Sequence, residues 1–346
     1  MKKYQQLAEQ LREQIASGIW QPGDRLPSLR DQVALSGMSF MTVSHAYQLL
    51  ESQGYIIARP QSGYYVAPQA IKMPKAPVIP VTRDEAVDIN TYIFDMLQAS
   101  RDPSVVPFAS AFPDPRLFPL QQLNRSLAQV SKTATAMSVI ENLPPGNAEL
   151  RQAIARRYAL QGITISPDEI VITAGALEAL NLSLQAVTEP GDWVIVENPC
   201  FYGALQALER LRLKALSVAT DVKEGIDLKA LELALQEYPV KACWLMTNSQ
   251  NPLGFTLTPQ KKARLVALLN QYNVTLIEDD VYSELYFGRE KPLPAKAWDH
   301  HDGVLHCSSF SKCLVPGFRI GWVAAGKHAR KIQRLQLMST LSTSSP

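Results

Sequence analysis

One lysine stands among hydroxyl and thiol side chains in the segment SSFSKCLVPGFRIGW, residues 308–322. This lysine, Lys312, has no acidic neighbour in the segment, and Arg319 follows it seven residues later. Burial of a lysine lowers its pKa, because the charged ammonium is disfavoured away from water, and the neutral amine is a nucleophile towards carbonyl groups. Pyridoxal phosphate offers an aldehyde to such an amine. The segment therefore suggests a pyridoxal phosphate site at Lys312.

A protein that holds this cofactor also needs a pocket for the phosphate group. The N-terminus of a helix that directly follows a strand provides one, because its free N–H groups point at the anion. The sequence EIVITAGALEAL has this form. Hydroxyl groups and an arginine from the lysine segment could add donors and positive charge. The candidate phosphate ligands are Gly175, Ala176, Leu177, Ser309, Ser311 and Arg319.

The ring of the cofactor needs a carboxylate for the pyridine nitrogen, a donor for the phenolic oxygen and a flat group against one face. Asp279 ends the apolar run VTLIED, and Tyr282 follows three residues later as a donor. Asn251, after the run KACWLMT, is a second donor. Phe201, just past the run WVIVE, is placed to stack on the ring, with Tyr202 as the alternative.

Each of these residues also has a purely structural explanation. Asp279 could cap a helix, Asn251 could form a turn before Pro252, Phe201 could belong to the core, and Arg319 could pair with a surface acid. Taken singly, each structural explanation is the stronger one. Their occurrence together, each at the carboxyl end of a predicted strand, favours a ligand site, because open α/β sheets bind ligands at that edge.

Short apolar runs alternate with helical stretches from about residue 108 onward. This alternation predicts a mainly parallel sheet with helices on both faces, an α/β domain over residues 108–346. The predicted strands are 169–173, 193–197, 214–220, 241–247, 274–280, 303–309 and 318–325. The predicted helices are 176–188, 203–212, 227–238, 259–272 and 327–338.

The first 67 residues have a different pattern. Tyr4, Leu7, Leu11 and Ile15 form the stripe of an amphipathic helix. Two further helices begin at the predicted N-caps Ser28 and Ser39, and two short strands around Pro-Gln-Ser-Gly follow. Three helices and a hairpin in this order predict a winged helix-turn-helix domain of the α+β class. Residues 68–107, which begin with a proline-rich stretch, are interpreted as a linker and bridging segment.

The N-terminal segment LPSLRDQVALSGMSFMTVSHAYQLLESQGYIIARPQSGYYV resembles the DNA-binding domain of the GntR family of bacterial regulators. A helical module for dimerisation or protein contacts is the alternative. The resemblance implies that the third helix enters the major groove of double-stranded DNA and that the wing lies near the phosphates. Members of the family usually carry an arginine at the position of Phe40. The candidate DNA contacts are Ser28, Arg30, Ser39, Thr42, Ser44, His45, Arg59, Ser62 and Gly63.

The C-terminal part, from PGNAELRQAIARRY to SFSKCLVPGFRIGW, resembles the fold type I aminotransferases. The resemblance implies that Lys312 bonds to the cofactor and that Asp279 serves catalysis by holding the pyridine nitrogen. A GntR-like reader fused to such a domain resembles the MocR subfamily of transcription regulators. The small C-terminal domain of fold type I enzymes has no counterpart in this chain, and we expect the chain to be a shortened form of a longer protein.

Composition is consistent with a folded, two-domain protein of this kind. The 346 residues carry a net charge of +2, and residues 1–70 hold six Lys or Arg and five Asp or Glu, so DNA binding would need two copies of the chain. No apolar run of membrane-spanning length and no secretory leader are present, and the four cysteines form neither a disulfide framework nor a metal motif. A cytoplasmic location and no membrane partner are expected.

Two functions remain open at this point. The first is a homodimeric transcription regulator whose cofactor domain senses a vitamer or an amino compound at Lys312. The second is a working aminotransferase, in which Lys312 also moves a proton on the amino-acid substrate and the DNA-binding module is secondary. Little turnover is expected of the chain without the small domain. The identity of the effector, the operator sequence and the sign of regulation are not encoded in any motif that we can interpret.

Overall fold

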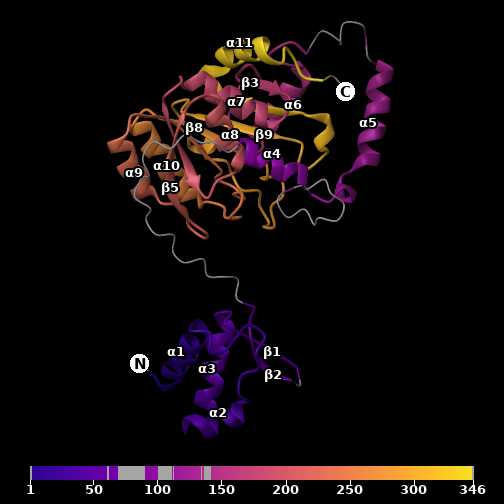
Figure 1. Ribbon diagram of the computed structural model, residues 1–346. Helices are drawn as coiled ribbons and strands as arrows, with labels where there is room; N and C mark the ends of the chain where they lie inside the picture. Colours follow the sequence, from indigo (N-terminus) through magenta and orange to yellow (C-terminus); the bar gives the residue numbers. More distant parts are fainter. Residues whose placement is uncertain are drawn as a thin grey trace. The chain divides into compact units, whose positions relative to one another are not determined.

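The computed structural model describes residues 2–60, 62–68, 90–99, 111, 113–133, 135 and 142–344. The chain divides into two compact units, Met1–Lys75 and Ala76–Pro346 (Figure 1). Most of the predicted linker, residues 68–107, lies outside the described residues. In the part that is described, no helix is long and apolar enough to cross a membrane.

The N-terminal unit has the predicted order of three helices followed by a hairpin. Ser28 and Ser39 are the N-caps of the second and third helices, and their hydroxyl oxygens accept hydrogen bonds from the backbone N–H groups of Asp31 and Thr42. The sequence therefore predicted both caps correctly. The elements are α1 (Lys3–Ala16), α2 (Leu29–Ser36), α3 (Phe40–Ser52), β1 (Ile56–Arg59) and β2 (Gly63–Val66).

The core of this unit is built around one face of α3. Val43, Ala46, Tyr47 and Leu50 have no exposed surface and pack against Leu7, Leu11 and Ile15 of α1. The hydroxyl of Tyr47 donates a hydrogen bond to the carbonyl oxygen of Pro27 at 2.9 Å, which ties α3 to the turn before α2. Because this face of α3 is buried in the core, the opposite face of the helix is turned towards solvent.

The larger unit is an α/β fold (Figure 1). Its strands are β3 (Ile170–Thr173), β4 (Trp193–Asn198), β5 (Lys214–Asp221), β6 (Gly225–Ile226), β7 (Val240–Leu245), β8 (Thr275–Asp279), β9 (Val304–Ser309) and β10 (Gly321–Ala324). Its α-helices are α4 (Asn90–Ala99), α5 (Leu120–Thr133), α6 (Ala148–Ala159), α7 (Ala176–Val187), α8 (Tyr202–Arg210), α9 (Leu228–Glu237), α10 (Pro259–Gln271) and α11 (Ala329–Ser339).

These strands form one sheet of eight in the order β3-β10-β9-β8-β7-β4-β5-β6. The five strands β9, β8, β7, β4 and β5 run parallel to one another, whereas β10 is antiparallel to both β3 and β9, and β6 is antiparallel to β5. The prediction of a mainly parallel sheet is confirmed. The direction of β10 was not predicted.

Both faces of the sheet are covered by helices, as predicted. Val194 and Val196 of β4 pack in a cluster with residues of α7, α8 and α11. Ile195, between them, points to the other face and packs with residues of α9 and α10. Side chains alternate across a strand, so a run of consecutive apolar residues is the sequence pattern of a strand buried on both faces.

One predicted strand begins later than expected. The run FRIGWVAA predicts a strand over residues 318–325, but β10 starts only at Gly321. Pro316–Phe318 form a 3-10 turn, and Arg319 follows with a φ of +53°, in the left-handed region. The arginine is therefore part of a turn that precedes the strand, and this turn directs its side chain.

Candidate functional site at the carboxyl edge of the sheet

Lys312 lies in the turn that follows β9 and is partly buried. Its Nζ donates a hydrogen bond to the carbonyl oxygen of Ala111 at 2.9 Å and lies 5.5 Å from the ring centroid of Tyr282. Burial lowers the pKa of Lys312, Asp279 opposes this shift, and the positive charge of Arg319 adds to it. The lysine thus has the electrostatic environment that favours a neutral, nucleophilic amine.

Asp279 is the last residue of β8 and is 2% exposed. Its Oδ1 atom is buried without a hydrogen-bond partner. Burial and the neighbouring Asp280 raise the pKa of Asp279 to about 7, although the indole of Trp244 opposes the rise. A buried carboxylate oxygen without a donor is rare in folded proteins, and it fits a site that receives a protonated nitrogen from a ligand.

Gly175 and Arg319 form a close pair at the start of α7. Gly175 is the N-cap of the helix with a φ of +88°, and a Cβ atom placed on it would lie 2.4 Å from Nη2 of Arg319. That same Nη2 donates to the carbonyl oxygen of Ala174 at 3.1 Å. A Cβ on Gly321 would lie 2.4 Å from the carbonyl carbon of Gly175. Only glycine fits at both positions, and the guanidinium therefore lies beside the free N–H groups of α7.

The remaining candidate phosphate ligands surround this helix end and the lysine turn. Ala176 is buried, whereas Leu177 is 47% exposed. Ser309 and Ser311 are 4% and 8% exposed, and the Oγ atom of Ser311 is buried without a hydrogen-bond partner. Two unpartnered polar atoms, on Asp279 and Ser311, together with the cradle between Gly175 and Arg319, fit a ligand that has both a ring nitrogen and a phosphate group.

The residues that were predicted to contact the cofactor ring lie after three neighbouring strands of the sheet. A hydrogen bond links the side chains of Tyr282 and Asn251, and burial followed by the charge of Asp279 raises the pKa of Tyr282 to about 12. Tyr202 also raises the pKa of Tyr282. The rings of Phe201 and Tyr202 lie 4.7 Å apart at the start of α8, and Phe201 packs closely over Gly203. The structure thus brings both candidate stacking rings to the same edge.

A buried polar network behind Asp279 was not found from the sequence. Asp280 accepts a hydrogen bond from Nδ2 of Asn248 at 2.9 Å and lies 3.0 Å from Nε2 of His306. The hydroxyl of Tyr158 lies 2.6 Å from Nδ1 of His306 and accepts from the indole N–H of Trp322 at 3.0 Å. These contacts join β8 to α6, β9 and β10, so they hold the end of β8 in place. Adjacent aspartates were the only signal in the sequence.

A cavity of about 620 Å³ opens beside the lysine site. Its lining includes Ala111, Asn251 and Tyr282, and an apolar segment, Leu285–Phe287, forms another part of the wall. Phe287 is fully exposed and Leu285 is 42% exposed. No role for this segment was predicted from the sequence, although the apolar run after Tyr282 could have indicated it. The cavity has the size of a small-molecule site.

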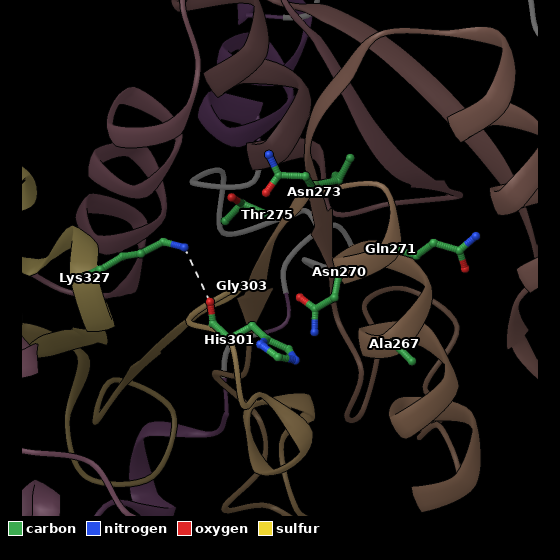
Figure 2. A pocket seen from close by; sticks show the side chains of 9 residues that line it. Ala267, Asn270, Gln271, Asn273, Thr275, His301, Gly303 and Lys327 are labelled. Atoms are coloured by element: carbon green, nitrogen blue, oxygen red, sulfur yellow. Dashed lines mark hydrogen bonds between the residues drawn. The ribbon is translucent and has the colours of Figure 1, made fainter.

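A second cavity, of about 380 Å³, lies at the opposite edge of the sheet. Figure 2 shows its polar lining, which includes Asn270 in the last turn of α10, Asn273 after that helix, Thr275 at the start of β8, and His301 and Gly303 before β9. Lys327 donates to the carbonyl oxygen of His301 at 3.4 Å. None of the predicted cofactor ligands lines this cavity, and it lies at the amino ends of the strands. It is therefore separate from the lysine site.

The predicted DNA contacts on α3 differ in their exposure. His45 is exposed and packs edge-on against Tyr4, with ring centroids 5.9 Å apart. Thr42 and Ser44 were expected to be exposed, but both are only partly so. The hydroxyl of Thr42 lies 2.9 Å from Oγ of Ser39, because the two side chains share the cap of the helix. For Thr42, this hydrogen bond is the physical reason for the difference.

The wing contains the other predicted contacts. Arg59 lies over the ring of Tyr65 at 4.3 Å, and the hydroxyl of Ser62 lies 2.6 Å from that of Tyr65. Gly63 has a φ of +112°, and its open side faces the guanidinium of Arg25. Arg25 is exposed and was not selected from the sequence. Arg30 is exposed on α2 as predicted.

A winged helix-turn-helix unit followed by an α/β unit with a lysine at the carboxyl edge of its sheet defines a class: DNA-binding proteins that contain the fold of pyridoxal phosphate-dependent transferases. Residues 103–346 match the model of aminotransferase class I and II, and residues 3–66 match that of bacterial regulatory proteins of the gntR family. The chain therefore belongs to the aminotransferase class I and II family and carries a gntR-family unit at its N-terminal side.

Known proteins of both kinds resemble the chain. It is 99% identical over 346 residues to the uncharacterized HTH-type transcriptional regulator YdcR of Escherichia coli (strain K12), covering all of this chain and 74% of that protein. It superposes on a multiple substrate aminotransferase from Thermococcus profundus with a TM-score of 0.67 and 30% identity, covering 72% of this chain and 64% of that one.

The α-aminoadipate aminotransferase LysN of Thermus thermophilus, solved with N-(5'-phosphopyridoxyl)-L-leucine, is a further structural relative. Its TM-score is 0.62 with 28% identity, covering 68% of this chain and 60% of that one. The chain thus spans about three quarters of the regulator and less than two thirds of each aminotransferase.

Proposed function

We propose that the chain is a DNA-binding transcription regulator whose larger unit holds pyridoxal phosphate at Lys312 and senses a vitamer or an amino compound. One observation carries the proposal: the partly buried Lys312, the unpartnered Oδ1 atom of Asp279 and the Gly175–Arg319 pair lie at one edge of the sheet. The gntR-family unit and the similarity to a named transcriptional regulator support a regulatory role for this site rather than an enzymatic one.

The residues of the site suit the parts of the cofactor. When bound, pyridoxal phosphate supplies an aldehyde that condenses with amines and a ring that accepts electrons. Asp279 would hold a proton at the pyridine nitrogen, while Tyr282 and Asn251 would donate to the phenolic oxygen, and Phe201 or Tyr202 would cover the ring. The phosphate would lie against Gly175, whose own N–H donates to the carbonyl oxygen of Thr173. It would be bound by the N–H groups of Ala176 and Leu177, the hydroxyls of Ser309 and Ser311, and the guanidinium of Arg319. The phosphopyridoxyl ligand of the related LysN supports this assignment.

Sensing would depend on the state of the Lys312 amine. An amino compound that took the place of Lys312 on the cofactor would leave this amine unbonded, in a site where burial and Arg319 lower its pKa and Asp279 raises it. A ligand changes the population of two conformations only through different interactions with each, and the bonded and unbonded states of Lys312 would provide such a difference. We infer that the chain acts as a homodimer in the cytoplasm, because an operator with two-fold symmetry would be read by two winged units.

The DNA contacts would come from α3, α2 and the wing. Ser44 and His45 would reach base edges, Arg30 and Arg59 would contact phosphates, and Gly63 would let the wing backbone approach the DNA. Ser28, Ser39 and Thr42 would act mainly through their remaining hydrogen-bonding capacity beside the caps of α2 and α3. Ser62 would do so beside Tyr65.

A direct test combines spectroscopy with DNA binding. We expect the protein to develop a yellow absorbance band with pyridoxal phosphate, and borohydride reduction to bleach the band and leave a label on Lys312. Lys312→Ala should abolish the band. Lys327→Ala, which removes a lysine from the opposite edge of the sheet, should retain it. Operator affinity that is indifferent both to the cofactor and to Lys312→Ala would remove the sensing role while leaving DNA binding intact.

A second candidate function is a working aminotransferase. The cavity of about 620 Å³ beside Asn251 and Tyr282 favours it, because an amino-acid side chain could be accommodated there. The amine of Lys312, once released, could move a proton from the α-carbon of the substrate. Conversion of amino acids to keto acids by the yellow protein would support this function, and its absence across a panel of amino acids would exclude it for this chain.

A further inference from the structure

Two large apolar side chains are exposed at the start of the recognition helix. Phe40 and Met41 are the first two residues of α3, and they are 51% and 61% exposed. The opposite side of the same helix is fully buried at Val43, Tyr47 and Leu50. The exposure of Phe40 and Met41 is therefore not caused by loose packing of α3 against the core.

The helix fixes the direction of the Met41 side chain. Met41, Ser44 and Gln48 are spaced three and four residues apart, so they share one side of α3, which faces away from the core. Gln48 is exposed and Ser44 is partly exposed. His45 is exposed on the same side and its ring contacts that of Tyr4. The outer side of α3 therefore presents an apolar group in its first turn and polar groups in the next two.

Polar groups near the first turn are already used by the helix itself. Ser39 accepts from the backbone N–H of Thr42, and the two hydroxyls lie 2.9 Å apart. This cap leaves Phe40 and Met41 as the large side chains that project from the first turn. In a helix-turn-helix unit, the N-terminal residues of the recognition helix, which is α3 in this protein, contact base edges in the major groove.

The charged residues of the N-terminal unit favour DNA over a protein partner. Arg30 on α2 and Arg59 on β1 are exposed. By contrast, Asp31 accepts a hydrogen bond from Ser28, and the carboxylate of Glu51 accepts from the N–H of Ala58. A unit with exposed arginines, in which these two acids are already hydrogen-bonded, suits a polyanion that carries apolar groups in its groove.

We propose that Phe40 and Met41 read thymine, by packing against the C5 methyl groups of thymines in the major groove. The proposal rests on the DNA-binding function proposed above and specifies the bases that the first turn of α3 recognises. The methyl group of thymine is the apolar feature of the major-groove edge of DNA, and apolar side chains are its usual partners. Removal of one buried methyl group should weaken binding roughly fourfold.

The experiment replaces thymine by uracil, which lacks only this methyl group. Duplexes bound by the 346-residue chain are first selected from a random library, and thymines in the selected sites are then replaced one at a time by deoxyuridine. We expect at least one replacement in each half-site to weaken the wild-type protein roughly fourfold. The double variant Phe40→Ala, Met41→Ala should bind the thymine and uracil duplexes equally well.

Gln48→Ala is the matched control, because Gln48 lies on the same outer side of α3 but is polar. This variant should keep the difference between thymine and uracil, whatever its overall affinity. Circular dichroism would verify that the double variant is folded, and the uracil comparison on the wild-type protein needs no variant at all.

Equal binding of thymine and uracil duplexes by the wild-type protein would overturn the proposal and leave DNA binding intact. A selection that enriches no sequence would instead remove both the proposal and the DNA-binding function. A difference between thymine and uracil that persists in the double variant would assign the methyl contact to other residues, and it would overturn the role of Phe40 and Met41.

Discussion

Asp279 and Ser311, at the edge of the sheet, are 2% and 8% exposed, whereas Phe40 and Met41, on the recognition helix, are 51% and 61% exposed. The first pair is buried with polar atoms that have no hydrogen-bond partner. The second pair is apolar and faces solvent. Each pair is in the environment that its chemistry disfavours, because buried polar atoms need partners and apolar surface is stabilised by leaving water.

The difference shows how the two units should respond to substitution. At the sheet edge, buried polar groups reduce the stability of the folded protein, so a substitution there should change both its stability and the proposed ligand binding. On the outer side of α3, the side chains contribute little to folding, so a substitution should alter DNA binding alone. The two units can therefore be compared by measuring stability and binding separately for each variant.

The largest effect on stability should come from the buried side of α3. Leu50 has no exposed surface, and Leu50→Ala should destabilise the N-terminal unit by about 2–5 kcal/mol through the cavity that it leaves. Met41→Ala, on the exposed side of the same helix, should change the free energy of unfolding by less than about 0.5 kcal/mol. Chemical denaturation followed by circular dichroism would measure both. Equal losses for the two variants would contradict the division of α3 into a core side and a free side.

The next effect concerns the pH dependence of the cofactor-free protein. The pKa of Asp279 is raised by burial from 3.8 to about 7, so the folded state binds its proton more tightly than the unfolded state does. The stability from this residue is fully present below about pH 4 and is lost as the pH rises to about 7. Asp279→Asn should abolish this loss and make the cofactor-free protein more stable above about pH 7.

Thermal unfolding at about pH 4.5 and about pH 8 would measure this difference. Glu197, whose pKa is raised to about 8 by burial and also by the charge of Asp279, adds a dependence of the same sign, so the comparison measures Asp279 together with its effect on Glu197. The same variant should bind pyridoxal phosphate more weakly, because the pyridine nitrogen loses its anionic partner. A variant that gains no stability at the higher pH would show that the buried charge of Asp279 does not destabilise the cofactor-free protein.

A smaller effect is expected from the glycine at the start of α7. Gly175→Ala would place a Cβ atom against the guanidinium of Arg319 and displace it, so pyridoxal phosphate should bind roughly tenfold more weakly. Gly191→Ala is the control, because Gly191 has a similar φ of +94° and no atom within 4 Å of the added Cβ. Absorbance titration with the cofactor would compare the two variants. Equal affinities would indicate that Arg319 does not bind the phosphate.

The smallest effect should come from the cap of the recognition helix. Ser39→Ala removes the acceptor for the N–H of Thr42 and should destabilise the N-terminal unit by about 1 kcal/mol. Since the first turn of α3 also carries Phe40 and Met41, DNA affinity should fall along with stability. Ser39→Asp, which retains an acceptor at the cap, should restore the stability. Denaturation and gel-shift measurements on both variants would test this.

The sequence was sufficient to predict the elements whose cause is local. Ser28 and Ser39 cap helices because their side chains satisfy backbone groups a few residues away. The strands of the larger unit follow from apolar runs such as WVIVE, because a strand covered on both faces has no polar side to reveal. Most residues proposed for the lysine site were selected because they end or follow such a strand, and the sheet places the ends of parallel strands together.

Features that depend on distant contacts were missed. The network of Asp280, His306 and Tyr158 joins residues that lie far apart in the chain, so no local pattern indicates it. Thr42 is a local exception: it was expected to be exposed, but its hydroxyl lies 2.9 Å from Oγ of Ser39 at the helix cap. Arg25 reaches the wing through the space that Gly63 leaves open, and only the folded backbone shows this.

Strand β10 lies between β3 and β9 and runs opposite to both. The chain that leaves β9 after Ser309 therefore turns back at the same edge of the sheet, instead of crossing to the far edge to begin a parallel strand. This reversal lets a stretch of eight residues, Lys312 to Arg319, span the distance between the amine and the end of α7. Any displacement of that short turn would move Lys312, the proposed site of cofactor attachment, and Arg319, the proposed phosphate ligand, together, so a change at the amine would reach the start of α7 directly.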